Sequence, residues 1–240
     1  MTDDPQMRPN RHGLGRVFNE VPELYDRVRP GYPDELFADL VTVTGMDARS
    51  SVLEVGCGTG QATRSLAKLG CSVTAIEPGK EMAALARQRI ATFGNVEVET
   101  SMFEEWGDRG RRFDVLVAAS SWHWVDQSTG WQRAHDVLHP TGWMALLGNV
   151  VVRRVGEPEV YAETADLHER FCPENPDWGH PPLEDDVRTT DEGWGLVEDR
   201  LCRSSSLIVA VPEALTGTGA KGQRAPRQLH RSAELPEHAH

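Results

Sequence analysis

The sequence predicts an α/β fold, an open, doubly wound and mostly parallel sheet with helices on both faces. Short apolar runs alternate with helical patterns between residues 51 and 149. The runs are apolar on both faces, which is typical of strands in a parallel sheet. Gly70, Gly94 and Pro140 mark the transitions between elements. A length of 240 residues suits one such domain with additions at its ends.

The expected elements begin with a polar, Pro-rich arm over residues 1–17. A helix over 33–41 follows, because Leu36, Phe37 and Leu40 share one face of it. In the core, strands are expected at 51–55, 72–76, 95–99, 113–118 and 142–148, and helices at 60–69, 80–91 and 128–138.

The pattern weakens after Asn149, where we expect a helix over 157–171, a loop over 173–182 and one strand over 206–211. Beyond Pro212 the chain has no aromatic residue, and this composition is typical of disorder. The expected parts are an arm and capping helix (1–48), a cofactor-binding core (49–150), a partly helical region with substrate-side elements (151–215) and a disordered tail (216–240).

The most informative motif is the run Val52-Leu53-Glu54-Val55-Gly56-Cys57-Gly58-Thr59-Gly60, a strand that ends in a glycine-rich turn. Glycines let backbone N–H groups approach a ligand, and the start of the next helix adds a partial positive field. A dinucleotide fingerprint would need glycine at position 61, where this chain has Gln61. The spacing therefore favours a different small-molecule cofactor.

Two further strand ends carry polar residues. Glu77 ends the second core strand, where a carboxylate can accept both hydroxyls of a ribose. Pro78-Gly79 follows Glu77, where an arginine would suit the 2′-phosphate of NADP. The alternative to ribose binding is that Glu77 only places a negative charge at the start of the next helix. The run Trp122-His123-Trp124-Val125-Asp126 follows the fourth strand. Since parallel strands end at one edge, the three ends define one crevice.

With Glu54 before it, the glycine turn resembles the first motif of class I S-adenosylmethionine (SAM)-dependent methyltransferases. The segments 122–126 and Tyr25-Asp26-Arg27-Val28-Arg29-Pro30-Gly31-Tyr32-Pro33 are similar to its small-molecule branch, which includes trans-aconitate methyltransferase-like proteins. The resemblance covers residues 18 to 150. It implies a Rossmann-like sheet, SAM as the cofactor, and methyl transfer to a small carboxylate, hydroxyl or amine.

Members of this family complete the sheet with two further strands, the last one antiparallel. Because only one strand is expected after Asn149, we expect the carboxyl-terminal sheet edge to be incomplete. A frameshifted or truncated gene would explain the change in composition, and so would a natural low-complexity extension.

The resemblance also implies roles for cofactor-binding residues. Glu54 would hold the methionine amino group, Glu77 the ribose, and Met102 with Phe103 the adenine, although packing of Phe103 in a short helix is an alternative. The remaining expected cofactor-binding residues are Gly56, Cys57, Gly58 and Gly60 in the turn and Ala119 and Ser120 after the fourth strand.

Methyl transfer from a sulfonium is a one-step displacement that needs alignment and exclusion of water more than catalytic groups. His123 is the candidate base, because a free imidazole has a pKa of about 6.5. It would deprotonate a hydroxyl or amine and only orient a carboxylate, and a purely structural histidine is the alternative.

The candidate substrate or lid residues are Tyr25, Arg29, Tyr32, Trp122 and Trp124. If the run 122–126 is extended, Trp122 and Trp124 point to opposite sides, so at most one of them faces the pocket.

Composition narrows the function classes. A formal net charge of −12 disfavours a nucleic-acid partner, because binding to phosphates depends on Lys and Arg. The four cysteines are widely spaced, so reduced thiols are expected and no metal site. The sequence has no apolar run of about 20 residues and no basic start, so we expect neither a membrane span nor a signal peptide. We expect a cytoplasmic protein that is a monomer or a homodimer. Alternatives to an active enzyme are a SAM-binding protein impaired by its altered carboxyl terminus and an NAD-dependent oxidoreductase.

Overall fold

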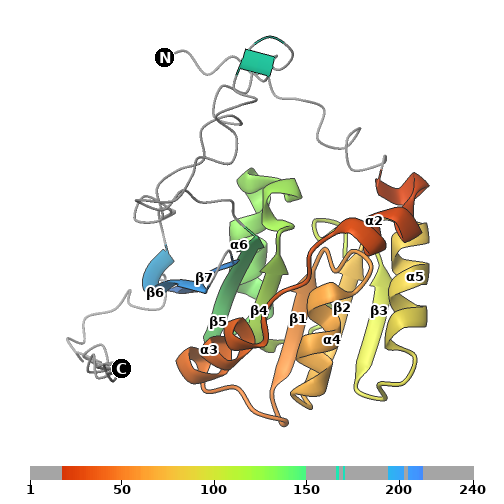
Figure 1. Ribbon diagram of the computed structural model, residues 1–240. Coiled ribbons are helices and arrows are strands. Elements are labelled where there is room, and N and C mark those ends of the chain that lie inside the picture. The colour runs from red at the N-terminus through yellow and green to blue at the C-terminus, as the bar shows by residue number, and fades with distance from the viewer. Residues whose placement is uncertain (1–17, 150–165, 168–169, 171–193, 203–204, 213–240) are drawn as a thin grey trace, which may run out of the picture.

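A computed structural model describes residues 18–149, 166–167, 170, 194–202 and 205–212, the last two stretches as backbone (Figure 1). Its strands form one sheet in the order β3-β2-β1-β4-β5-β7-β6. The parallel part consists of β1 (Ser51–Val55), β2 (Ser72–Glu77), β3 (Val96–Thr100), β4 (Phe113–Ala119) and β5 (Leu138–Asn149). β7 (Ser205–Pro212) is antiparallel to β5 and to β6 (Trp194–Cys202). The predicted doubly wound α/β fold is confirmed.

Helices cover both faces of the sheet (Figure 1). α3 (Asp34–Thr44), α4 (Gln61–Lys68) and α5 (Lys80–Ile90) lie on one face, and α6 (Gln127–Val137) lies on the other. The short helix α2 (Pro22–Val28) lies across the carboxyl ends of the strands, and η2 (Trp122–Trp124) is a 3₁₀ turn after β4.

The core has two halves because the central strands are apolar on both sides. Val52 and Val115 pack with Leu36 of α3 and Leu66 of α4 on one face. On the other face, residues such as Leu53, Leu116 and Met144 pack with Ala134 and Val137 of α6. This two-sided burial holds the strand ends, and therefore the site, in a fixed arrangement.

Most predicted elements agree with the structure to within a few residues. β5 begins at Leu138 rather than at residue 142, because the chain extends directly from the end of α6. The sequence does not predict α2, since this helix buries only Pro22 and leaves Val21, Leu24 and Val28 exposed, so it lacks a buried apolar stripe.

The carboxyl-terminal side of the sheet requires a correction. The sequence predicts one strand after Asn149, and β7 agrees with it, but the structure also contains β6. β6 escapes prediction because Glu198-Asp199-Arg200 interrupts its apolar pattern and a bulge lies between Leu196 and Glu198. Charges and bulges are common in edge strands. The sheet remains open and ends at β6 on this side.

Several expectations lie outside the described residues. They are the arm over 1–17, the loop over 173–182, the tail over 216–240 and most of the helix over 157–171, of which residues 166–167 and 170 are helical.

One close contact aligns the ends of β1 and β4. Gly56 has a φ of +69°, and a Cβ placed on it would lie 2.6 Å from the Cβ of Ser121. The Ser121 hydroxyl donates a hydrogen bond to the carbonyl of Val55. A residue without a Cβ is therefore required where the glycine turn passes the loop after β4.

We expect Gly56→Ala to lower the free energy of unfolding by about 1–3 kcal/mol, because the substitution adds backbone strain to a steric clash. Urea denaturation measures this loss. Gly94→Ala is the matched control, since a Cβ on Gly94 meets no atom within 4 Å. Equal stability of the two variants would contradict the proposed constraint.

Candidate functional site

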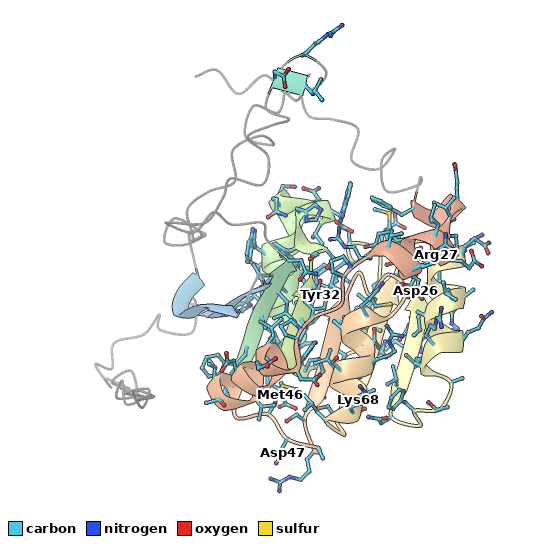
Figure 2. The ribbon with its side chains drawn as sticks, in the orientation of Figure 1. Asp26, Arg27, Tyr32, Met46, Asp47 and Lys68 are labelled. Carbon is cyan, nitrogen blue, oxygen red and sulfur yellow. The ribbon has the colours of Figure 1, made fainter. Side chains whose placement is uncertain are left out.

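A cavity of about 940 Å³ opens at the carboxyl ends of β1, β2 and β4, beneath α2 and the segment that follows it. Figure 2 shows Asp26 and Tyr32 at this edge, whereas Met46, Asp47 and Lys68 lie at the opposite edge. The predicted site residues that line the cavity are Tyr25, Arg29, Tyr32, Glu54, Gly56, Cys57, Gly58, Glu77, Met102, Phe103, Ala119, Ser120, His123 and Trp124.

Two predicted residues, Gly60 and Trp122, do not line the cavity. Gly60 has a φ of +90°, and a Cβ placed on it would lie 3.7 Å from atoms of Ala86 and Ile90 in α5. It therefore serves the turn and the packing of α4 near α5. Trp122 is 7% exposed and belongs to the core, where the centre of its ring lies 4.9 Å from the centre of the Trp131 ring.

Glu77 connects the tip of β2 to the glycine turn. Its Oε2 accepts a hydrogen bond from the Gly58 N–H and its Oε1 accepts one from the Gly79 N–H, both at 2.9 Å. Burial raises the pKa of Glu77, and these two backbone hydrogen bonds oppose the rise. Each carboxylate oxygen keeps a second lone pair, so the group can still accept two hydroxyls from a ligand.

Glu54 is the most deeply buried acid of the cavity, with 1% of its surface exposed. Among the described residues, neither of its carboxylate oxygens has a hydrogen-bond partner of normal geometry. Burial raises the pKa of Glu54 to about 7, the Thr63 hydroxyl lowers it, and the charge of Glu77 adds to the rise. A buried acid without a partner fits a cationic ligand group such as an ammonium.

The two residues expected to contact the adenine, Met102 and Phe103, differ in their burial. Met102 is half-buried and lines the cavity. Phe103 is 4% exposed, with its ring 5.9 Å from Trp122 and the Arg133 guanidinium 5.5 Å from its centre. The Phe103 ring is therefore packed against core residues at the cavity wall, and Met102 is the more exposed of the two side chains.

Ser120 links the end of β4 to the amino-terminal segment. Its φ is +52°, an uncommon value for a residue with a Cβ. Its hydroxyl accepts a hydrogen bond from the Tyr32 hydroxyl at 2.9 Å, and its backbone N–H donates to the carbonyl of Leu147 at 2.7 Å. Such strained residues persist where the surroundings hold them, and they cluster at functional sites.

The segment after β4 is a 3₁₀ turn and not an extended stretch. The turn nevertheless separates the two tryptophans, since Trp122 enters the core and Trp124 lines the cavity. The Trp124 ring lies 6.3 Å from Phe18, and the exposed His123 ring lies 4.9 Å from Trp124. His123 is thus exposed at the cavity surface.

Sequence reasoning missed residues that fasten the amino-terminal segment. Asp26 accepts a hydrogen bond from the Thr59 hydroxyl at 2.9 Å and forms an ion pair with Arg89 at 2.7 Å. The side-chain oxygen of Asn19 accepts from the N–H groups of Glu81 and Met82, so it caps α5. Asp26 belongs to the Tyr-Asp motif of the amino-terminal segment, whereas no local signal distinguishes Asn19, whose partners lie far away in sequence.

No group of three or more His, Cys, Asp or Glu residues could hold a metal ion among the residues that the structure describes. Cys57 and Cys71 are buried free thiols. No described helix has both the length and the apolar character needed to cross a bilayer.

The structure is an open α/β sheet with a glycine turn, an acid on the neighbouring strand and a cavity at the carboxyl edge, where ligands of such sheets bind. Residues 52–142 match the family model described as methyltransferase domain. This stretch of the chain is therefore similar to a methyltransferase domain.

Two mycobacterial proteins and one solved structure are similar to this chain. An uncharacterized methyltransferase of Mycobacterium tuberculosis is 30% identical over 62% of this chain and 59% of its own length. A trans-aconitate 2-methyltransferase of the same species is 30% identical over 55% of this chain and 53% of its own. The chain thus spans little more than half the length of these curated relatives. The structure of the DhpI complex with S-adenosylhomocysteine (SAH) shares the fold, with a TM-score of 0.55, 22% identity, and coverage of 84% of this chain and 96% of that one.

The raised pKa of Glu54 predicts an unusual pH dependence of stability. The folded protein holds a proton on Glu54 up to about pH 7, whereas the unfolded chain releases it near the ordinary value of 4.5. The contribution of Glu54 to the free energy of unfolding is therefore fully present below pH 4.5, and it is lost as the pH rises through 7.

Accordingly, we expect Glu54→Gln to gain stability relative to the wild type between pH 5 and 8, by about 3 kcal/mol at most. Urea unfolding at several pH values measures the difference. Parallel stability curves for the two proteins would contradict the raised pKa.

Proposed function

We propose that this protein transfers a methyl group from SAM to a small-molecule acceptor. The observation that carries the proposal is the pair of buried carboxylates, Glu54 and Glu77, which lie on adjacent strands and open on one cavity. Two acids at this edge suit a ligand with a cationic amino-acid end and a ribose. They do not suit the diphosphate of NAD, which the glycine spacing also disfavours.

Different residues of the chain would bind different parts of the cofactor. When bound, SAM supplies an electrophilic methyl group on a sulfonium. Glu54 would hold the ammonium, and Glu77 would accept the ribose hydroxyls with the lone pairs that Gly58 and Gly79 leave free. Gly56 and Gly58 have positive φ and let the backbone pass close to the ligand.

The acceptor side of the cavity combines aromatic rings with a cation. Tyr25, Arg29 and Tyr32 come from the amino-terminal segment, and His123 and Trp124 come from the turn after β4. Arg29 can pair with a carboxylate, and the rings can exclude water from the reacting atoms. These groups favour a small acceptor that carries a carboxylate or an aromatic ring.

His123 is proposed as the base when the acceptor atom is a hydroxyl or amine. Its ring is exposed at the cavity, so it can take the proton from the acceptor and pass it to water. With a carboxylate acceptor, which is already ionised, His123 would only orient the substrate. The cytoplasmic location and the monomeric or homodimeric state remain predictions.

We expect Glu77→Ala to weaken SAH binding roughly 10- to 100-fold, the usual scale for hydrogen bonds to a charged group. Isothermal titration calorimetry measures the dissociation constant, and thermal melting shows that the variant is folded. Glu105→Ala is the control, because Glu105 is exposed and does not line the cavity. An unchanged dissociation constant would limit Glu77 to holding the turn, and NAD binding without SAH binding would contradict the proposed function.

We expect His123→Ala to reduce turnover roughly 10²- to 10⁴-fold while SAH affinity stays nearly constant, because proton transfer contributes on that scale. A screen of small carboxylic acids and phenols identifies the acceptor for this assay. His139→Ala, an exposed histidine that does not line the cavity, should retain full turnover. Binding of SAH without turnover of any acceptor by the wild type would favour the alternative of a SAM-binding protein without catalysis.

A further inference from the structure

The amino-terminal segment, residues 18–32, lies over the cavity, and several of its side chains line it. The Tyr25 ring lies beside the glycine turn, since a Cβ placed on Gly58 would be 4.0 Å from Cε1 of Tyr25. At the start of the segment, the centre of the Phe18 ring lies 6.3 Å from that of Trp124 in η2. A ligand at the glycine turn therefore has to pass this segment to enter or leave.

Apolar packing holds α2, the helix of this segment, only weakly. α2 has seven residues, of which only Pro22 is buried, whereas Leu24 and Val28 are exposed. A helix of this length is not stable by itself in water. The next helix, α3, buries three apolar side chains and is therefore anchored in the core. α2 is thus the part of the segment that can open at a low cost in free energy, and its position depends on polar contacts.

Asp26 supplies two of these contacts from the middle of α2. Its Oδ1 accepts a hydrogen bond at 2.9 Å from the hydroxyl of Thr59, a completely buried residue of the glycine turn. Its Oδ2 forms an ion pair at 2.7 Å with the half-exposed Arg89 of α5. Only 8% of the Asp26 side chain is exposed. A carboxylate buried to this extent needs such partners, so the closed position of α2 and the two contacts form together.

The contacts of Asp26 do not face the ligand. Neither Asp26 nor Thr59 nor Arg89 lines the cavity, so their contacts can be the same whether the cavity is empty or filled. A contact that is the same in the free and the bound protein cannot change the affinity for a ligand. It can change how often the protein opens, and therefore both the rate of entry and the rate of release.

We propose that Asp26 is a positioning residue that holds α2 closed over the cavity, so that exchange of the cofactor requires its contacts with Thr59 and Arg89 to break. α2 then moves about the extended stretch between Arg29 and Pro33, while α3 stays in the core. The cofactor in this inference rests on the proposed function. The closure of α2 by Asp26 does not, and it can be measured without a ligand.

Stopped-flow fluorescence measures the association and dissociation rates of SAH with the full chain. Asp26→Asn keeps an acceptor for Thr59 and loses the charge that pairs with Arg89. Both rates should rise roughly 3- to 30-fold, while their ratio, Kd, stays within about twofold. Arg89→Met should do the same. The double variant should differ from either single variant by less than about twofold, because both substitutions remove the same ion pair.

Hydrogen exchange of the unliganded proteins tests the closure without a ligand. The backbone amides of α2 should exchange faster in Asp26→Asn and in Arg89→Met than in the wild type, because α2 opens more often. Asp47→Asn is the matched control, since Asp47 pairs with Arg49 at the same distance, 2.7 Å, but at the opposite edge of the sheet (Figure 2). It should change neither the SAH rates nor the exchange in α2.

Two results would overturn the inference. One is that Asp26→Asn leaves the rates and the exchange in α2 unchanged. The other is a weaker affinity that comes from faster dissociation alone, because Asp26 would then stabilise only the bound state. A wild-type protein that does not bind SAH would overturn the proposed function, and hydrogen exchange would still decide whether Asp26 holds α2 closed.

Discussion

The site depends on the burial of one carboxylate near the end of a central strand. Glu54 lies on β1, between β2 and β4, and is almost completely removed from solvent. Such a group is costly in its ionised form unless a positive charge meets it, so burial alone favours the protonated acid. Under the proposed function, the ammonium of the cofactor would offset that cost, so the burial that destabilises the ionised group would favour a cationic ligand.

The amino-terminal segment lines the same cavity as this acid and is held in place by contacts at both of its ends. Asp26 fastens α2 to Thr59 of the glycine turn and to Arg89 of α5, and the Tyr32 hydroxyl reaches Ser120 at the tip of β4. The amino-terminal segment is thus bonded to the same turns that would hold the cofactor. Any shift of the glycine turn on binding would be transmitted to the residues that face the acceptor.

The sequence is sufficient to predict the parallel core, because each strand carries its own apolar run and each turn its own glycine or proline. It is also sufficient to bring Glu54, Glu77 and His123 to one edge, since all three lie at or just beyond strand ends. It fails for α2 and β6, whose sequences lack a regular apolar pattern, and for Asn19. The contacts of Asn19 join residues far apart in the sequence, and only the folded chain reveals them.

The two halves of the cavity are built differently, and this difference bears on specificity. The half that is proposed to hold the cofactor consists of buried acids and backbone turns that the core holds in place, as at Glu54 and Gly56. The half that is proposed to hold the acceptor consists of more exposed side chains, such as His123 and Arg29, carried on a short turn and on the amino-terminal segment. Substitutions there change few core contacts. Under the proposed function, a fold of this kind could therefore keep its methyl donor while its acceptor changes.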